Sequence, residues 1–409
     1  MLKIQNRTLL ILIGLSFLSI YPIIPFKLES LSVIFFVLCS LIHSIVSEKN
    51  KKYKKTFFTV SILYFVLLIS ALLSMNMAEG LKMMETMLSL VVFPIIFYLF
   101  LGESKLDFSK IKYFFLRSYY VSSLVFSLIS FYLFTTYQNP KYLFMDSNFF
   151  RMAILDNQYF GDHPIYVSIF ISLAIIFGFS FFDVKRKYTW QNFLLLISQI
   201  NLIVLLFLLM SKGVIIALTF VFIIKLFRCK RIKKSHILAV IFLLSLFFVL
   251  IPEKNNRFKE IINLTSYEVL DENNSTSIRV IIYKCGIENV LNNFLMGVGI
   301  GDVQEKLDLC YDQKQANFKK GMYNSHNQYL FVWLSTGILG ILVFIYFLGY
   351  YFKKAMHYDD HLMISVLVLY SVVFLFENVL SRQSGVIFFS FLVNFFLWIN
   401  LNKKKIHAS

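Results

Sequence analysis

The chain has 409 residues, of which 58% are hydrophobic and only 15% are charged, and its mean hydropathy is +0.70. A soluble globular protein is usually about 45–50% apolar and about 25% charged, so this composition excludes a soluble fold and requires lipid as part of the solvent. The formal net charge of +17 would suggest nucleic-acid binding on a soluble chain, but here the basic residues follow a membrane topology, and no nucleic-acid partner is expected.

Long apolar runs recur along the whole chain. A membrane-spanning helix needs about 20 apolar residues, and runs of roughly that length occur at residues 8–26, 30–46, 56–74, 81–101, 111–135, 164–182, 191–210, 213–227, 236–251, 328–350, 361–378 and 384–401. The first run could be a signal peptide, but no small-residue cleavage site follows it. The sequence therefore predicts an all-α, polytopic membrane bundle of about twelve transmembrane helices, give or take one.

The polar connectors between these runs alternate in charge. If they are assigned to the two sides of the membrane in turn, the basic clusters all fall on one side, at residues 48–55, 185–187, 228–234, 353–354 and 403–405. Short cytoplasmic loops collect Lys and Arg, so this alternation predicts that both termini are cytoplasmic.

Two long connectors fall on the other side of the membrane. Residues 1–251 are predicted to hold helices one to nine with an outer loop near 136–163, residues 252–327 a large extracytoplasmic loop, and residues 328–409 helices ten to twelve and a basic tail. The large loop carries its own helical pattern, with N-cap hydroxyls at Ser275 to Ser277 and a stop at Gly297.

Four cysteines are too few for a disulfide scaffold. Cys285 and Cys310 share the large outer loop, and the sequence is equally compatible with a disulfide between them and with two unpaired thiols.

Three basic residues stand out by position. Arg279 lies in the first turn of the predicted loop helix, where a cation fits if it holds an anion together with the free backbone amides; the alternative is a solvated arginine. His326 lies where the loop re-enters the membrane and could be a general base or a helix-capping histidine. Lys212 interrupts a long apolar stretch, as a functional charge or as part of a surface turn.

A second group of polar residues lies near the outer ends of the predicted helices. His163 ends the first outer loop, Arg257 follows the ninth helix, and Glu377 lies close to Arg382, with which it could simply pair. The glycines of residues 297–301 resemble a dinucleotide loop only superficially, because no βαβ unit surrounds them. The acidic residues between 302 and 312 show no metal-ligand spacing, so neither a metal nor a cofactor is expected.

Taken together, the chain resembles the O-antigen ligase and O-antigen polymerase family. That family is similar in having about twelve membrane helices and a large outer loop before the last three. The resemblance rests on Arg279, on the segment Leu295-Met-Gly-Val-Gly-Ile-Gly301, and on His326-Asn327-Gln-Tyr-Leu330, in this order. It covers residues 200–350 best. Lys212 stands where many members have arginine within Ser-Arg-Gly, and lysine lacks the bidentate fork.

The resemblance implies an inverting, metal-independent glycosyltransferase in the bacterial inner membrane. A polyprenyl-diphosphate-linked glycan is the donor, and a lipid or glycan hydroxyl on the periplasmic side is the acceptor. His326 matches the family's general base and Arg279 its diphosphate-binding arginine. Lys212, Arg257, His163, Glu377, Arg382 and Asn327 are expected to bind diphosphate or glycan. The sequence does not separate a ligase from a polymerase; a transporter or flippase and a scaffold protein are the rival classes.

Overall fold

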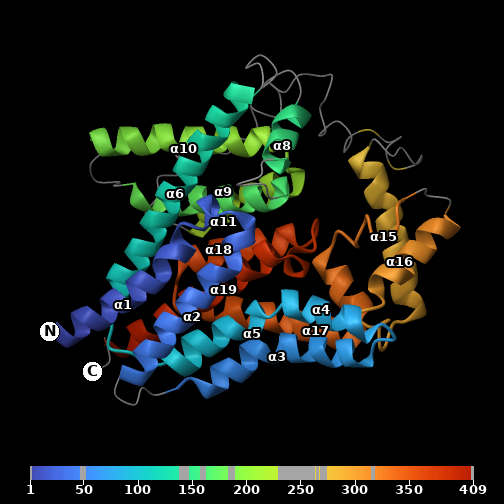
Figure 1. The fold of residues 1–409 in the computed structure, drawn as a ribbon, viewed down its shortest axis with the longest axis horizontal. Helices are drawn as coiled ribbons and strands as arrows, with labels where there is room; N and C mark the ends of the chain where they lie inside the picture. Colours follow the sequence, from blue (N-terminus) through green and yellow to red (C-terminus); the bar gives the residue numbers. More distant parts are fainter. Residues whose placement is uncertain are drawn as a thin grey trace.

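The protein is helical throughout the part that the structure describes. The computed structural model describes residues 2–46, 52–137, 147–156, 163–182, 189–228, 263, 267, 274–314 and 318–406. Every regular element in these residues is a helix, which confirms the predicted all-α class (Figure 1). The longer elements are α1 (Leu2–Ser19), α2 (Glu29–Val46), α3 (Lys54–Leu73), α4 (Met77–Thr86), α5 (Ser89–Pro94), η3 (Ile95–Leu101), α6 (Phe108–Tyr137), α8 (Ser147–Leu155), α9 (Pro164–Gly178), α10 (Trp190–Leu208), α11 (Lys212–Arg228), α15 (Ser275–Asn292), α16 (Val303–Gln313), α17 (Gln328–His357), α18 (His361–Val373) and α19 (Gln383–Ile406).

Short turns of 3-10 helix complete the described elements: η1 (Tyr21–Ile23), η2 (Phe26–Leu28), η4 (Phe179–Phe181) and η6 (Val379–Ser381).

Seven of the described helices are long and apolar enough to cross a membrane, so the chain is a multi-pass membrane protein. The pair formed by α4 with α5 and η3 is bent by 46° and counts as an eighth span if it is taken as one. Two further apolar helices, Arg7–Ser19 within α1 and His361–Val373, are shorter than a full span. The total of about twelve stays a prediction, because the expected run at 236–251 lies outside the described residues.

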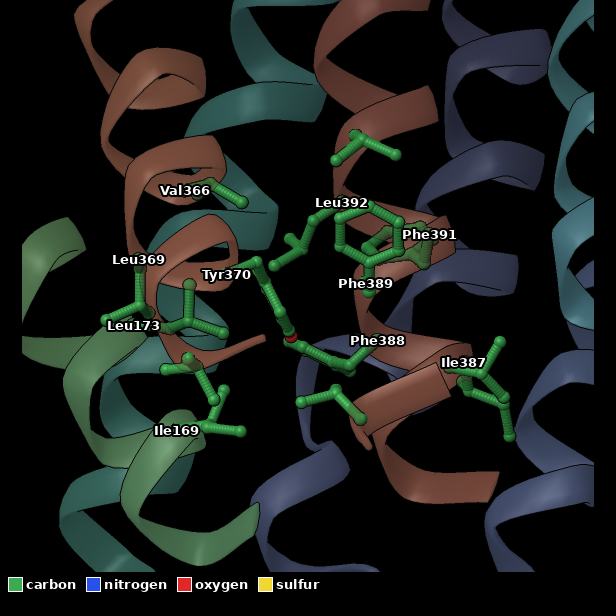
Figure 2. Close-up of a cluster of buried hydrophobic side chains, with 14 of the residues drawn as sticks. Ile169, Leu173, Val366, Leu369, Tyr370, Ile387, Phe388, Phe389, Phe391 and Leu392 are labelled. Atoms are coloured by element: carbon green, nitrogen blue, oxygen red, sulfur yellow. The ribbon is translucent and has the colours of Figure 1, made fainter. Parts of the chain in front are cut away.

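The centre of the bundle is built from α19 and α9. Their spans are 94% and 83% buried, against 33% to 50% for the other described spans. Figure 2 shows Phe388, Phe389 and Phe391 of α19 beside Tyr370 of α18 and Ile169 of α9. The rings of Tyr370 and Phe389 meet edge to face with centroids 5.0 Å apart, an arrangement that the ring quadrupoles favour. Lipid tails are as apolar as these side chains, so close packing is what holds the centre together.

The two ends of the bundle differ. Both termini lie at one end and the helices α15 and α16 at the other (Figure 1). A disulfide joins Cys285 of α15 to Cys310 of α16, with Cα atoms 5.7 Å apart. The structure thus selects the disulfide from the two states that the sequence left open.

The predicted helix in the large loop is confirmed as α15, but both of its ends differ from the prediction. Its N-cap is Asn274, whose side-chain oxygen accepts hydrogen bonds from the backbone N–H groups of Thr276 (2.9 Å) and Ser277 (3.2 Å). Asparagine at this position competes successfully with the hydroxyl residues that follow it. The helix ends at Asn292, and Gly297 lies in the segment beyond it.

That segment explains the glycine pattern of residues 297–301. The backbone of Val298 donates to the carbonyl of Leu334 at 2.7 Å, where α17 is kinked at Gly337. Gly297 and Gly337 have φ values of +74° and +67°, which favour glycine, and a Cβ on Gly337 would lie 2.1 Å from the carbonyl oxygen of Leu295. The glycines therefore allow the backbone of the segment after α15 to contact the backbone of α17 directly.

An acidic residue also holds the segment after α15 in place. Asp302 accepts hydrogen bonds at 2.8 Å from the backbone N–H groups of both Met75 and Asn76, at the turn between α3 and α4. Its carboxylate is thereby used to hold the outer loop to the membrane helices.

Candidate active site

The loop that carries His326 is held in a strained conformation. His326 has a φ of +42°, unusual for a residue with a side chain and worth about 1–3 kcal/mol of strain. Its backbone N–H donates to Oδ1 of Asn324 at 2.9 Å, and its carbonyl accepts from the hydroxyl of Tyr283 in α15 at 3.3 Å. The surrounding structure therefore over-determines the position of the imidazole.

The imidazole pairs with a buried carboxylate. Nδ1 of His326 lies 3.2 Å from Oε2 of Glu377, and the side chains are 22% and 6% exposed. Burial alone would raise the pKa of Glu377, but the hydrogen bond and charge of His326, together with the charge of Arg279, hold this pKa below its ordinary value. Glu377 is thus a carboxylate at neutral pH, and it fixes the ring on its Nδ1 side.

A second network locks the two chain segments that carry this pair. Oδ1 of Asn378 accepts from the backbone N–H of Asn327 at 2.8 Å, and its amide nitrogen donates to Oγ of Ser325 at 2.9 Å. The backbone of Gln328 donates to the carbonyl of Phe374 at 2.7 Å. The start of α17 and the segment after α18 are therefore joined, which keeps His326 and Glu377 next to each other.

A cavity of about 60 Å³ opens beside Glu377. It is lined by Arg279 from α15, Lys212 from the start of α11 and Arg151 from α8, together with Ser275. The volume would admit about four water molecules or a group of phosphate size. Three cations from three separate helices thus converge on one small space.

Lys212 is 7% exposed, and its Nζ lies 3.3 Å from Oγ of Ser275. It is the first residue of α11, directly after a break at Met210, whose φ is +50°. Lys212 follows a turn, as one interpretation of the sequence held, but the turn does not expose it: it is a buried cation that lines the cavity, and its functional role stays a prediction.

His163 belongs to the same electrostatic cluster. It caps α9, where its Nδ1 accepts from the backbone N–H of Ile165 at 3.5 Å. Burial lowers the pKa of His163 from its ordinary 6.5 to about 4; Glu377 raises it in part, and Arg382 and Arg151 lower it further. His163 is therefore neutral at pH 7.

The other expected residues have different surroundings. Asn327 is the N-cap of α17, with Oδ1 accepting from the backbone of Leu330 at 3.0 Å. Arg382 lies over the ring of Tyr166 at 5.8 Å. The interpretation that Glu377 and Arg382 pair with each other is wrong, because the partner of Glu377 is His326. Arg257 lies outside the described residues.

Sequence reasoning missed Arg151. Its guanidinium donates to the carbonyl of Leu209, next to the break that precedes Lys212. A signal was present, since Arg151 is the one cation in an amphipathic helix of the outer loop at 136–163. Nothing local linked that loop to the residues of the large loop.

Part of this site lies in a segment that is similar to a known family. Residues 193–345 match the family model described as O-antigen ligase, and the matched segment contains Lys212, Arg279 and His326. A comparison with curated proteins found no match. The chain is thus a multi-pass membrane protein with a segment, residues 193–345, that is similar to the O-antigen ligase family.

Proposed function

We propose that the protein transfers a glycan from a polyprenyl-diphosphate donor to an acceptor hydroxyl, on the periplasmic side of a bacterial inner membrane. The observation that carries this proposal is the convergence of Arg279, Lys212 and Arg151 on one cavity beside the His326–Glu377 pair. Cations and a base in one place match a reaction in which a diphosphate leaves while a hydroxyl loses its proton.

The cations would bind the leaving group. When the bond between the anomeric carbon and the diphosphate oxygen breaks, the electron pair stays on the diphosphate, and negative charge concentrates there. Positive groups fixed in advance stabilise that charge without reorganising, and removal of one such group typically costs about 3–4 kcal/mol of barrier. Arg279 can chelate two phosphate oxygens, whereas Lys212 supplies a point charge.

His326 would be the base. With Nδ1–H donated to the carboxylate of Glu377, the lone pair of Nε2 is left to accept the proton of the acceptor hydroxyl. The hydroxyl oxygen then forms its bond to the anomeric carbon on the face opposite to the diphosphate. This single displacement inverts the anomeric configuration and takes its driving force from the diphosphate linkage.

Two related activities remain alternatives within the same chemistry. A ligase joins the glycan to a lipid acceptor such as the lipid A core, and a polymerase joins it to another glycan repeat. The transporter or flippase class is less supported, because a transporter places its charged site near the middle of the bilayer, whereas these charges gather at the helix ends beside α15.

The test is complementation of a deletion strain, with surface polysaccharide examined on gels. We expect His326→Ala and Arg279→Ala to abolish long-chain glycan on the acceptor at normal protein levels, whereas the controls His361→Ala and Arg228→Ala, at the other end of the bundle, retain it. Unchanged banding with His326→Ala would contradict the base assignment. In the deletion strain itself, free lipid-linked polymer indicates a ligase, and an acceptor with one repeat indicates a polymerase.

A further inference from the structure

A second, much larger hollow lies between α6 and α10. It is an open hollow of about 1100 Å³ and shares no lining residue with the cavity at Lys212. Its walls are mainly apolar side chains of the two helices, among them Leu116, Val121 and Leu124 of α6 and Leu194, Leu195 and Ile197 of α10, with polar side chains such as Ser198 and Asn201 between them. We call this hollow the α6–α10 groove. The proposed transfer reaction makes no use of it.

One end of the α6–α10 groove is cationic. Lys112, Arg117 and Lys403 line it there, from the first turns of α6 and the last turns of α19. Lys112 pairs with Asp360 at 3.1 Å, and the guanidinium of Arg117 lies 6.0 Å from the centre of the Tyr113 ring. One carboxylate therefore faces three cations, and the end of the groove has excess positive charge.

Arg117 extends that charge along α6. It comes nine residues after Phe108, so it lies about 13 Å along α6 from the helix start. Since α6 has 30 residues and is longer than a hydrocarbon core of about 30 Å, the exposed side chain of Arg117 can reach the membrane interface. An anionic group between Arg117 and Lys403 would neutralise this charge.

The length of the α6–α10 groove fits one leaflet. Along α10 its lining runs from Gln191 to Asn201, which is about 15 Å and half of a hydrocarbon core of about 30 Å. The cationic end lies where α6 and α10 begin and α19 ends, the end of the bundle at which both chain termini lie (Figure 1). The groove thus has its charge at the membrane surface and its apolar walls toward the bilayer centre.

We propose that the α6–α10 groove is a binding site for an anionic glycerophospholipid of the leaflet that faces the chain termini. The phosphate-bearing head group lies among Lys112, Arg117 and Lys403, and an acyl chain lies along the apolar walls. Basic pockets between transmembrane helices bind anionic head groups in this way. The donor's own lipid is a poorer match, because its diphosphate would lie at Arg279, at the opposite end of the bundle.

The test uses the purified full-length protein and native mass spectrometry with phosphatidylglycerol or phosphatidylcholine of identical acyl chains. We expect the wild type to retain phosphatidylglycerol preferentially. Arg117→Gln with Lys403→Gln should weaken phosphatidylglycerol binding by about tenfold or more, since each basic residue near a lipid surface contributes about a factor of five. The matched control Lys54→Gln with Lys55→Gln removes the same charge at the start of α3 and should retain the preference.

A second variant tests the apolar wall with the head-group site intact. Leu124→Trp should reduce the binding of both lipids, whereas Ile69→Trp on the exposed face of α3 should leave it unchanged. Equal retention of the two lipids by the wild type would overturn the proposal. So would displacement of phosphatidylglycerol by undecaprenyl phosphate, which would assign the groove to the tail of the donor. Neither result bears on the catalytic assignment of His326.

Discussion

At the scale of single residues, the pairing of His326 with Glu377 does most to define the site. The two residues are 51 positions apart, yet their side chains meet at 3.2 Å, and both neighbouring backbones are tied by hydrogen bonds to Asn378 and Gln328. A ring held this way presents one nitrogen in a constant direction. Glu377 acts through His326, and we regard it as a positioning residue.

Glu377→Gln is expected to lower the transfer rate by about 10²- to 10⁴-fold, the usual contribution of oriented acid–base catalysis. The acidic limb of the pH–rate profile should also move to lower pH, because a protonated imidazole loses its counter-ion. The measurement is transfer of a lipid-linked glycan in vitro across pH 5 to 9. Glu305→Gln, an exposed carboxylate in the first turn of α16, is the control and should leave rate and profile unchanged. A slower enzyme with an unshifted profile would mean that Glu377 is merely structural.

His163 predicts how stability depends on pH. Its pKa of about 4 in the folded protein lies below the ordinary 6.5, so the unfolded chain binds the proton more readily. The contribution of neutral His163 to the free energy of unfolding is fully present above pH 6.5 and is lost as the pH falls toward 4. The loss amounts to about 3 kcal/mol at most, since one unit of pKa difference corresponds to about 1.36 kcal/mol. The lowered pKa of Glu377 acts in the same direction at lower pH. The melting temperature should therefore fall steadily between pH 6.5 and 4.5.

His163→Gln should flatten this dependence in thermal unfolding of the detergent-solubilised protein. His361→Gln, at the start of α18 where the side chain is 39% exposed, should leave the slope as it is in the wild type. If the wild type and His163→Gln lose stability equally on acidification, the histidine is not buried in its neutral form.

At the scale of elements, the outer loop is joined to the membrane helices by the kink of α17. The segment after α15 lies between α17 and the α3–α4 turn, where Ile300 donates from its backbone to Oγ of Ser70 at 3.0 Å. α15 carries Arg279, so this contact helps to hold the helix of a cavity-lining residue against the membrane helices. The disulfide between Cys285 and Cys310 braces the same helix against α16.

Gly337→Ala is expected to destabilise the protein by more than about 2 kcal/mol, because alanine at this positive φ is strained and its Cβ would clash with the carbonyl oxygen of Leu295. Gly349→Ala in the same helix is the matched control, since no atom lies within 4 Å of its Cβ. This control should be neutral or slightly stabilising. The measurements are the melting temperature and the yield of folded protein after solubilisation in detergent. Equal behaviour of the two variants would show that the kink tolerates a side chain.

At the scale of the whole molecule, the two ends of the helix bundle carry different features. The disulfide-linked helices α15 and α16, of which α15 carries Arg279, lie at one end, and the termini lie at the other (Figure 1). Disulfides persist on the oxidising side of a membrane. The disulfide and the basic connectors thus support the orientation that we propose, with the loop periplasmic and the termini cytoplasmic.

Reporter fusions test that orientation. Alkaline phosphatase inserted after Gly321, an exposed loop position with no atom near its Cβ, should be active, and the same enzyme fused to the C-terminus should be inactive. A fluorescent protein fused to the C-terminus should fluoresce, and the same protein inserted after Gly321 should not. Activity of the C-terminal phosphatase fusion would place the termini outside and would reject the periplasmic site.

The sequence could predict whatever depends on local composition. Each apolar run within the described residues coincides with a helix or a bent helix pair, and the loop helix at Arg279 is present as α15. Helix ends were predicted less well: Asn274 replaces the expected hydroxyl caps, and α18 ends at Val373 before a turn. Caps and turns depend on which neighbour accepts a given backbone group, and periodicity contains no such information.

By itself, the sequence determined that the chain is helical and crosses a membrane several times, and its motifs predicted the resemblance to the O-antigen ligases that residues 193–345 show. Only the tertiary structure decided that Glu377 belongs to His326, that Arg151 joins Lys212 and Arg279 at one cavity, and that Cys285 and Cys310 are bonded. The reason is physical. Whether a segment lies in lipid depends on its own apolar composition, which the sequence gives directly. The site is formed by helix ends that are far apart in the sequence, and their distance in space depends on how the helices pack.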